Sequence, residues 1–175
     1  MPWWADVSDL PPPPWAPGVR PACCARRCAR RRRLVRPVEL ALAAAVKSPQ
    51  VTIVHFWAPW CPNCRTELRE GGWNAFIDSH PDVHFIFVTL WNPADGHEAL
   101  AKAGVGNQMN FQLLLEPNGS KGKDRVRALL GMPISWIPTT WIFKDGHLTY
   151  AMNYGELRFP MLQQLIVDSG DRWEH

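Results

Sequence analysis

The sequence predicts an α/β sandwich with a central mixed β-sheet. Two continuous β-branched and aromatic runs, 51–57 and 83–90, have the composition of strands buried on both faces, and a helical segment separates them. A later pair of strand-like runs joined by Asp145 and Gly146 indicates a β-hairpin, and an amphipathic helix follows it. A βαβ unit followed by a hairpin and a final helix fits a mixed sheet packed against helices.

The individual elements follow from local patterns along the chain. The segment 38–47 is rich in Ala and Leu and ends before Pro49, which predicts a short helix. In the last expected helix, Leu162, Leu165 and Ile166 share one face, so they should point inward. The other expected elements are, in order, a strand at 51–57, a helix from 62 to about 79, a strand at 83–90, a helix at 94–103, a strand at 111–115, a helix at 123–130, hairpin strands at 140–143 and 147–152, and a helix at 159–167.

Composition indicates one folded domain after an unusual N-terminal segment. The chain has 175 residues, 46% of them apolar and 20% charged, as in ordinary soluble proteins. Residues 1–36 hold eight arginines against two aspartates, so the formal net charge of +3 leaves about −3 for the rest. We expect a disordered or leader-like Arg/Pro-rich segment at 1–36, one folded domain at 37–170 and a short tail at 171–175.

The role of the N-terminal segment stays open at this level. Its composition also fits translation of a GC-rich region from a misplaced start. Cys23, Cys24 and Cys28 could bind a soft metal, but no second Cys or His cluster lies near them. The basic run 30–33 could contact nucleic acid or anionic lipid. A solvated tail is preferred in both cases, so we expect neither a metal nor a nucleic-acid partner.

Export signals in the sequence are poor. A secretory leader needs a basic start, an apolar stretch of about 7–15 residues and a cleavage site with small residues. The run 30–33 precedes apolar residues in this way, but Arg36, Pro37 and Glu39 interrupt them. No stretch reaches the roughly 20 apolar residues of a spanning helix, so a membrane tether is conceivable but unsupported.

The pair Cys61 and Cys64 lies where a buried strand is followed by a helix. At a helix N-terminus, unpaired backbone N–H groups and the helix dipole stabilise negative charge, which favours the thiolate of Cys61. We expect Cys61 to be the exposed attacking sulfur and Cys64, one turn later, to resolve the mixed disulfide. Pro62 fits the first helical position, where its missing N–H costs nothing. A structural zinc site would need a second ligand pair, and residues 65–175 contain no further cysteine.

These cysteines belong to a longer run, 54–68 (VHFWAPWCPNCRTEL), that resembles the thioredoxin superfamily and, within it, the TlpA/ResA-like disulfide reductases. A second match lies at 137–140 (IPTT) with 143–146 (FKDG), and the similar arrangement covers roughly residues 38–167. The resemblance implies a thioredoxin-like three-layer sandwich with a C-terminal β-hairpin and a central αβ insertion at 91–122. It also implies that Pro138 follows a cis peptide bond and lies against the dithiol.

The same resemblance assigns a substrate-binding role to residues around the dithiol. Trp60, Pro62, Ile137, Pro138 and Thr139 are expected to hold an extended substrate. Pro138 cannot donate a backbone hydrogen bond, whereas the neighbouring Ile137 backbone is free to pair with a visiting strand.

Two further residues could move protons. Glu67 matches a glutamate that the TlpA/ResA-like branch carries near its dithiol, where it could exchange a proton with a thiol; it could equally lie on a solvated helix face. His55, nine residues before Cys64, stands where thioredoxins carry a buried acid. It either accepts the Cys64 proton or is a core histidine satisfied by backbone groups.

The sequence departs from the family pattern at two points. Arg69 stands where a helix-kinking proline is usual, so the glycine pair 71–72 is expected to provide any bend. The segment before the second motif is longer and more aromatic than usual. Trp136, with Trp60 and Trp91, either forms an apolar rim around the dithiol or belongs to the core.

Together, the residues and the resemblance predict a thiol-disulfide oxidoreductase that acts on protein substrates through Cys61 and Cys64, more as a reductase than as an oxidant. Its redox group would be the Cys61–Cys64 disulfide itself, without another cofactor. The expected partners are protein thiols or disulfides and an upstream thiol reductant or oxidant, and a monomer is expected. By resemblance it works in the periplasm or elsewhere outside the cytoplasm, with the cytoplasm as the alternative. The competing hypotheses are a redox sensor and a peptide- or metal-binding module without rapid turnover.

Overall fold

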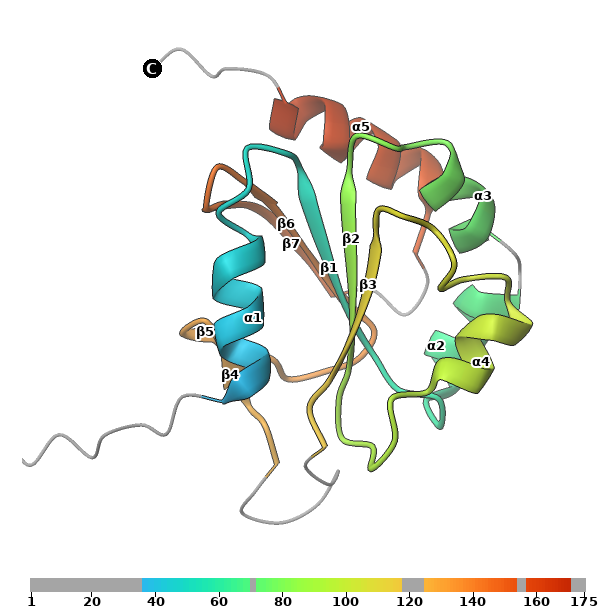
Figure 1. The fold of residues 1–175 in the computed structure, drawn as a ribbon. Helices are drawn as coiled ribbons and strands as arrows, with labels where there is room; N and C mark the ends of the chain where they lie inside the picture. Colours follow the sequence, from blue (N-terminus) through green and yellow to red (C-terminus); the bar gives the residue numbers. More distant parts are fainter. Residues whose placement is uncertain (1–35, 70–71, 118–124, 154–156, 171–175) are drawn as a thin grey trace, which may run out of the picture. The chain divides into compact units, whose positions relative to one another are not determined.

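Five strands form the central sheet of the protein (Figure 1). The structure is a computed structural model, and it describes residues 36–69, 72–117, 125–153 and 157–170. The five strands are β1 (Thr52–Trp57), β2 (His84–Thr89), β3 (Phe111–Leu115), β6 (Thr139–Lys144) and β7 (His147–Met152). The strands lie in the order β3-β2-β1-β6-β7. β1, β2 and β3 are parallel, whereas β6 is antiparallel to β1 and β7 is antiparallel to β6. The sheet is therefore mixed, as predicted.

Helices cover both faces of this sheet. One face is covered by α1 (Pro37–Ala45) and a small hairpin of β4 (Ala128–Leu129) and β5 (Met132–Pro133). The other face is covered by α2 (Pro62–Arg69), α3 (Gly72–Asp78), α4 (His97–Lys102) and α5 (Phe159–Gly170). Figure 1 shows α1 on one side of the sheet and the other four helices on the opposite side. This arrangement confirms the predicted three-layer sandwich.

The strand β1 is buried on both faces and separates the two halves of the core. Side chains alternate along a strand, so Ile53 and Trp57 belong to the layer under α2–α5, whereas Val54 and Phe56 belong to the layer under α1. The polar side chain of His55 is also buried, with 2% of the residue exposed. β1 therefore leaves the core only at its end, directly before the two cysteines.

Two expected helices differ from the prediction in their extent. The helix expected from 62 to about 79 is two helices: α2 ends at Arg69 and α3 begins at Gly72, where the bend was expected. The helix expected at 94–103 begins only at His97, because Gly96 has a φ of 81°, outside the helical region. The Asp95 carboxylate accepts a hydrogen bond from the His97 backbone N–H at 2.9 Å and so satisfies one end group of the helix.

The helix predicted at 123–130 is wrong for residues 125–130, the part of this range that the structure describes. Residues 125–127 are irregular, and the following residues form β4, which pairs with β5. Leu130 and Gly131 have φ values of 50° and 79°, which close a tight turn between the two strands. Leu129 packs in the same core layer as Leu42 of α1, so tertiary packing outweighs the local helix preference.

Other predicted elements are confirmed to within a few residues. Asp145 and Gly146 have φ values of 51° and 81°, the conformation of a type I′ hairpin turn, and they join β6 to β7 as expected. In α5, Leu162 is fully buried, Ile166 is 8% exposed, and Leu165 packs against the same core layer. The local signals in these segments agree with the tertiary contacts.

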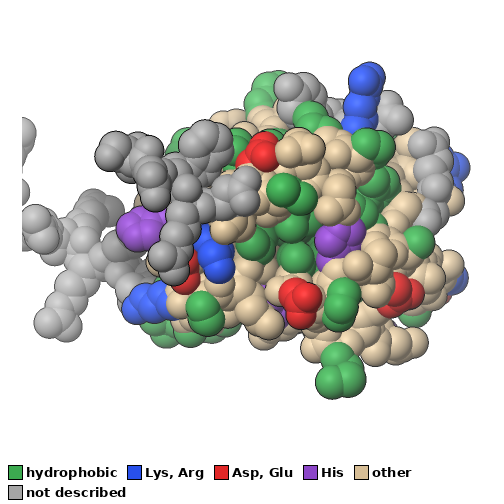
Figure 2. Space-filling view, turned by 90° about the horizontal axis from the view of Figure 1, so that it is seen from above, with side chains coloured by type: hydrophobic (Ala, Val, Ile, Leu, Met, Phe, Trp, Pro, Cys, Tyr) green, Lys and Arg blue, Asp and Glu red, His purple; other side chains and the backbone are tan. Residues whose placement is uncertain are grey.

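Figure 2 shows the end of the sheet at which β1 and β2 begin. Lysine and arginine side chains are scattered on this face among acidic, histidine and apolar side chains. A shallow hollow of about 350 Å³ lies at this end, lined by Gln50, Pro81, Val83, His84, Met109 and Asn110. The two cysteines lie at the opposite end, where β1 is followed by α2.

Replacing Gly72 by alanine should destabilise the fold. A methyl group at this position would lie 1.8 Å from the ring of Phe159, and that ring is held by Trp73 and Phe76, at centroid distances of 5.3 Å and 5.2 Å. Overpacking of this kind typically costs about 1–3 kcal/mol. We expect a loss of that size in the free energy of unfolding of Gly72→Ala, measured by urea denaturation.

The matched control is Gly170→Ala at the end of α5, where an added methyl group has no neighbour within 4 Å. Its stability should stay within about 0.5 kcal/mol of the parent protein. Equal midpoints for the two variants would contradict the clash.

Candidate active site

Cys61 lies in the turn that joins β1 to α2. Its backbone N–H donates to the Ala58 carbonyl at 3.1 Å, and its own carbonyl accepts from the Arg65 N–H at 3.0 Å. The second bond is the first hydrogen bond of the helical pattern, so Cys61 stands at the N-terminus of α2, with Pro62 as the first helical residue. This confirms the predicted placement.

Both cysteines are free thiols, and a side-chain hydrogen bond joins Cys64 to Cys61. Cys61 is 5% exposed and Cys64 is 1% exposed. The prediction of an exposed Cys61 therefore needs correction: the residue is the more accessible of the two, but it is largely covered. Its sulfur donates to the carbonyl oxygen of Ile137 at 3.5 Å, so the segment before Pro138 lies against the thiol.

The peptide bond between Ile137 and Pro138 is cis, as the resemblance implied. Pro138 and Thr139 are buried, whereas Ile137 is partly exposed. The Thr139 hydroxyl donates to the Trp136 carbonyl at 3.0 Å, which ties the segment into a turn before β6 begins. The structure thus brings the second sequence motif against the dithiol, although 76 residues separate Cys61 from Ile137.

The environment of Cys64 opposes loss of its proton. Burial raises the pKa of the Cys64 thiol well above its usual value, and the hydrogen bond with Cys61 and the nearby charges of Cys61 and Glu67 act in the same direction. A backbone hydrogen bond with Ala58 acts in the opposite direction but does not cancel these effects. Cys64 therefore stays protonated until a base takes its proton.

Glu67, one turn after Cys64 on α2, is buried together with His55 of β1. His55 Nε2 lies 3.5 Å from Glu67 Oε2, and both side chains are 3% exposed, so the solvated-face alternative for Glu67 is wrong. The other carboxylate oxygen accepts a hydrogen bond from the Leu157 backbone N–H at 2.9 Å. Burial lowers the pKa of His55 to about 3, so its imidazole is neutral at physiological pH.

Thr140 is a partner that sequence reasoning missed. Its hydroxyl lies 2.9 Å from His55 Nδ1, so the ring nitrogens of His55 face side chains rather than the backbone groups of the core-histidine alternative. His55 and Thr140 are directly opposite in the antiparallel pairing of β1 with β6. Only this register reveals the contact, since Thr140 otherwise reads as part of the second motif.

The three tryptophans divide between surface and core. Trp60 is 47% exposed and Trp136 is 68% exposed, but Trp91 is only 4% exposed. The indole N–H of Trp91 donates to the Val126 carbonyl at 2.9 Å. The backbone carbonyl of Trp91 accepts a hydrogen bond from the indole N–H of Trp60 at 3.1 Å. Trp91 is therefore a core residue that supports Trp60, and the predicted rim reduces to Trp60 and Trp136.

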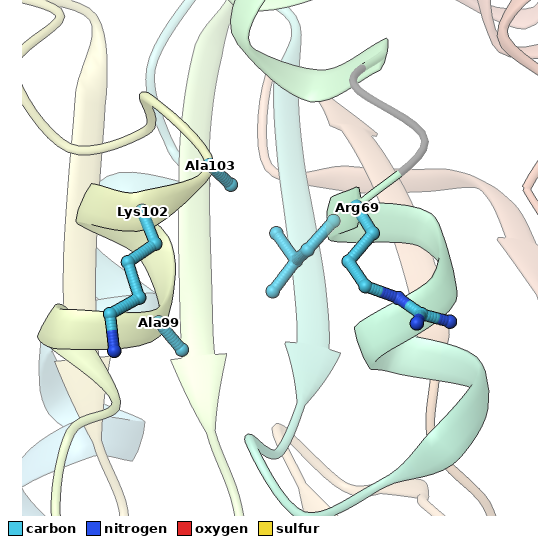
Figure 3. Close-up of a pocket in the computed structure, with 5 residues that line it drawn as sticks. Arg69, Ala99, Lys102 and Ala103 are labelled. Atoms are coloured by element: carbon cyan, nitrogen blue, oxygen red, sulfur yellow. The ribbon is translucent and has the colours of Figure 1, made fainter.

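A separate cavity of about 350 Å³ lies between α2 and α4, lined by Leu68, Arg69, Ala99, Lys102 and Ala103. Figure 3 shows the charged ends of Arg69 and Lys102 pointing apart rather than toward a common centre. Lys102 pairs with Glu98 at 2.6 Å, and Arg69 donates to the Thr66 hydroxyl at 3.3 Å. Within the described ranges, no three His, Cys, Asp or Glu side chains gather to hold a metal ion. The dithiol is thus the best candidate for chemistry.

The neutral state of His55 predicts a pH-dependent stability. Because the folded-state pKa of about 3 lies below the unfolded value of about 6.5, the unfolded chain takes up the proton first as the pH falls. This histidine should therefore lower the free energy of unfolding by up to about 1.4 kcal/mol per pH unit between pH ~6 and pH ~3.

Urea denaturation of the wild type and of His55→Asn across this range measures the slope. In His55→Asn, the slope of the free energy of unfolding against pH should fall by up to about 1.4 kcal/mol per pH unit, the contribution of one proton. His97→Asn, at an exposed position, should retain the parent slope. Parallel curves for the wild type and His55→Asn would contradict a buried neutral imidazole.

Known proteins provide a comparison for this geometry. Residues 38–169 match the family model described as a thioredoxin-like domain. Sporulation thiol-disulfide oxidoreductase A of Bacillus subtilis (strain 168) is 30% identical over 98 residues, which are 55% of this chain and 54% of that protein. The chain thus spans about half the length of this curated relative.

Two solved structures share the fold. A putative thiol:disulfide interchange protein DsbE from Chlorobium tepidum is 20% identical, with a TM-score of 0.53 and coverage of 73% of this chain and 85% of that chain. A DsbF homologue from Corynebacterium diphtheriae is 16% identical, with a TM-score of 0.53 and coverage of 71% and 74%. Since the family model spans both cysteines and the cis-proline segment, the chain belongs to the thioredoxin-like domain family.

Proposed function

We propose that the protein is a thiol-disulfide oxidoreductase that acts on protein substrates, working as a reductase through Cys61-Pro62-Asn63-Cys64. The observation that carries this proposal is the pair of hydrogen-bonded free thiols at the start of α2, with the more accessible sulfur against the carbonyl before cis-Pro138. The name of the B. subtilis relative supports the same chemistry.

The exchange proceeds in two steps that balance atoms and electrons. The Cys61 thiolate attacks one sulfur of a substrate disulfide, the substrate S–S bond breaks, and one substrate thiolate leaves and takes up a proton. Cys64 then loses its proton and attacks Cys61, so the mixed disulfide breaks and the second substrate thiol is released. The enzyme is oxidised to the Cys61–Cys64 disulfide and the substrate is reduced. The sulfur pair carries both electrons, so no other cofactor takes part.

The substrate is held by groups that surround the attacking sulfur. The Ile137 backbone lies 3.5 Å from the Cys61 sulfur, so an extended chain that pairs with Ile137 brings its own cysteine to the thiol. Pro62, Pro138 and Thr139 shape this edge, and exposed Trp60 contributes apolar contact. Glu67 receives the Cys64 proton, since it is the buried carboxylate whose charge acts on that thiol.

The expected setting is outside the cytoplasm, with an upstream thiol partner that returns the disulfide to the dithiol and with the protein acting as a monomer. This location rests on the resemblance to exported relatives. Within the part of the chain that the structure describes, no helix combines the length and apolar character needed to cross a membrane.

One observation favours a second candidate function. Cys61 is only 5% exposed, and a covered nucleophile suits a redox sensor that reacts slowly and changes a partner interaction. A sensor would show slow turnover with protein disulfides, so the rate of turnover separates it from the reductase.

Replacing Cys61 by serine should abolish catalysis. Serine keeps the size of the side chain but cannot form the mixed disulfide, so reduction of insulin disulfides by the purified protein should fall to the uncatalysed rate. Cys64→Ser is the informative companion, since it should still attack and should accumulate a mixed disulfide with the substrate. Undiminished insulin reduction by Cys61→Ser would remove that residue from its role.

The direction of electron flow is tested by the equilibrium potential of the Cys61–Cys64 pair against a glutathione buffer. For a reductase we expect a value near the roughly −270 mV of thioredoxin. A value near the roughly −120 mV of the oxidant DsbA would reverse the assignment and make the protein a disulfide donor.

A further inference from the structure

Thr140, His55 and Glu67 form a continuous chain of polar side chains inside the apolar layer under α2 and α3. Thr140 Oγ1 lies 2.9 Å from His55 Nδ1, and His55 Nε2 lies 3.5 Å from Glu67 Oε2. These three side chains come from β6, β1 and α2. All three residues are buried, with exposed fractions of 3%, 2% and 6%. At the Glu67 end, Cys64 lies three residues earlier on α2, one turn away, and the charge of Glu67 acts on its thiol.

If Glu67 accepts the Cys64 proton, it must start as the carboxylate, and this state fixes the hydrogen positions in the chain. An ionised carboxylate can only accept, so the ring nitrogen that faces it, Nε2, carries the hydrogen. A neutral imidazole has one N–H, and Nδ1 is therefore an acceptor. The Thr140 hydroxyl then donates to Nδ1. In this arrangement a hydroxyl on β6 selects the tautomer that carries its hydrogen on Nε2, the ring nitrogen 3.5 Å from the carboxylate.

The neighbouring rings hold the imidazole in this orientation. Trp73 of α3 and Phe87 of β2 both lie with their ring centroids 4.8 Å from the centroid of the His55 ring. Glu67 is fixed in turn at its other oxygen by the Leu157 N–H at 2.9 Å. Among the described residues, the ionisable groups that act on or lie near Glu67 include His55, from β1, and Cys64, from α2.

We propose that Thr140 and His55 are positioning residues that orient and stabilise the Glu67 carboxylate, so that Glu67, and not His55, takes the Cys64 proton. This inference rests on the proposed function. In the resolving step, the Cys64 S–H bond breaks and a Glu67 O–H bond forms. The Cys64 sulfur then bonds to Cys61 and the substrate thiolate leaves. The net buried charge is unchanged by the proton transfer.

The alternative acceptor, His55, is poorly placed for this task. Taking the proton would turn it into an imidazolium, and burial lowers the pKa of His55 to about 3, so that charge is strongly disfavoured. Both of its nitrogens already face partners, Thr140 and Glu67. The imidazole therefore acts as a neutral dipole that stabilises a neighbouring charge.

The test is the pH profile of the resolving step in Thr140→Val, which replaces the hydroxyl by a methyl group of similar size. Mixing the reduced protein with the aromatic disulfide DTNB releases one coloured thiolate when Cys61 attacks and a second when Cys64 resolves. Stopped-flow absorbance separates the two phases, since only the first depends on DTNB concentration.

In Thr140→Val the acid limb of the second phase should move to higher pH, so that resolution near pH 6 slows about tenfold, the effect of one lost hydrogen bond that supports a charge. The first phase should change little. Thr140→Ser, which restores a hydroxyl, should return the profile toward the wild type.

The matched control is Thr149→Val on β7, which removes a hydroxyl that bonds to the Ile142 carbonyl and to Ser169. This variant should leave the profile of the second phase in place. An unchanged profile in Thr140→Val, or an equal shift in Thr149→Val, would overturn the proposal. Absence of a second phase in the wild type would instead refute the proposed function.

Should Thr140→Val fail to fold, the wild-type protein still decides the matter. Nitrogen-15 chemical shifts of labelled histidine distinguish the two neutral tautomers and the imidazolium. At pH 7, His55 should be the neutral form with the hydrogen on Nε2. A hydrogen on Nδ1, or a charged ring, would overturn the proposal.

Discussion

The burial of β1 on both faces is the constraint on which the candidate active site depends. Because Thr52–Trp57 lies between β2 and β6, the chain can leave the core only at the end of this strand, where it turns into α2. The turn holds Cys61, and the start of β6 next to it brings the cis-proline segment. One central strand thus places two segments that are distant in the sequence side by side. The position of each segment is set by its connection to or pairing with β1, and not by its own residues alone.

The same burial means that the polar side chains of Glu67, His55 and Thr140 would destabilise the fold unless each has a partner. A buried carboxylate is tolerated only with hydrogen bonds or an opposing dipole, and Glu67 has the Leu157 N–H and the neighbouring His55. His55 in turn is satisfied by Thr140. The apolar rings around this chain strengthen its electrostatic interactions, since little solvent screens them. Fold stability and the proposed proton transfer therefore rely on the same few contacts.

Local signals predicted those parts of the fold in which tertiary packing agrees with them. The turn at Asp145 and Gly146 has residues that accept positive φ, and the structure uses them so. The segment 125–133 could not be read in this way. Leu130 adopts a positive φ of 50°, which is unfavourable for its residue type, and Leu129 is buried by contacts within the core layer to which α1 contributes. Those contacts depend on the assembled sheet and have no signature within the segment.

In the candidate site, too, some features follow from local sequence and others only from tertiary contacts. The position of Cys61 at a helix start follows from its neighbours in the sequence. The burial of its thiol does not, because the Ile137 carbonyl that contacts it comes from the distant segment before β6. That burial has a chemical consequence in the proposed exchange. A substrate that reaches the sulfur must replace the contact between the thiol and Ile137, and a backbone N–H of an extended chain can take over this carbonyl. In the proposed exchange, the group that covers the thiol would thus also be the group that pairs with an extended partner.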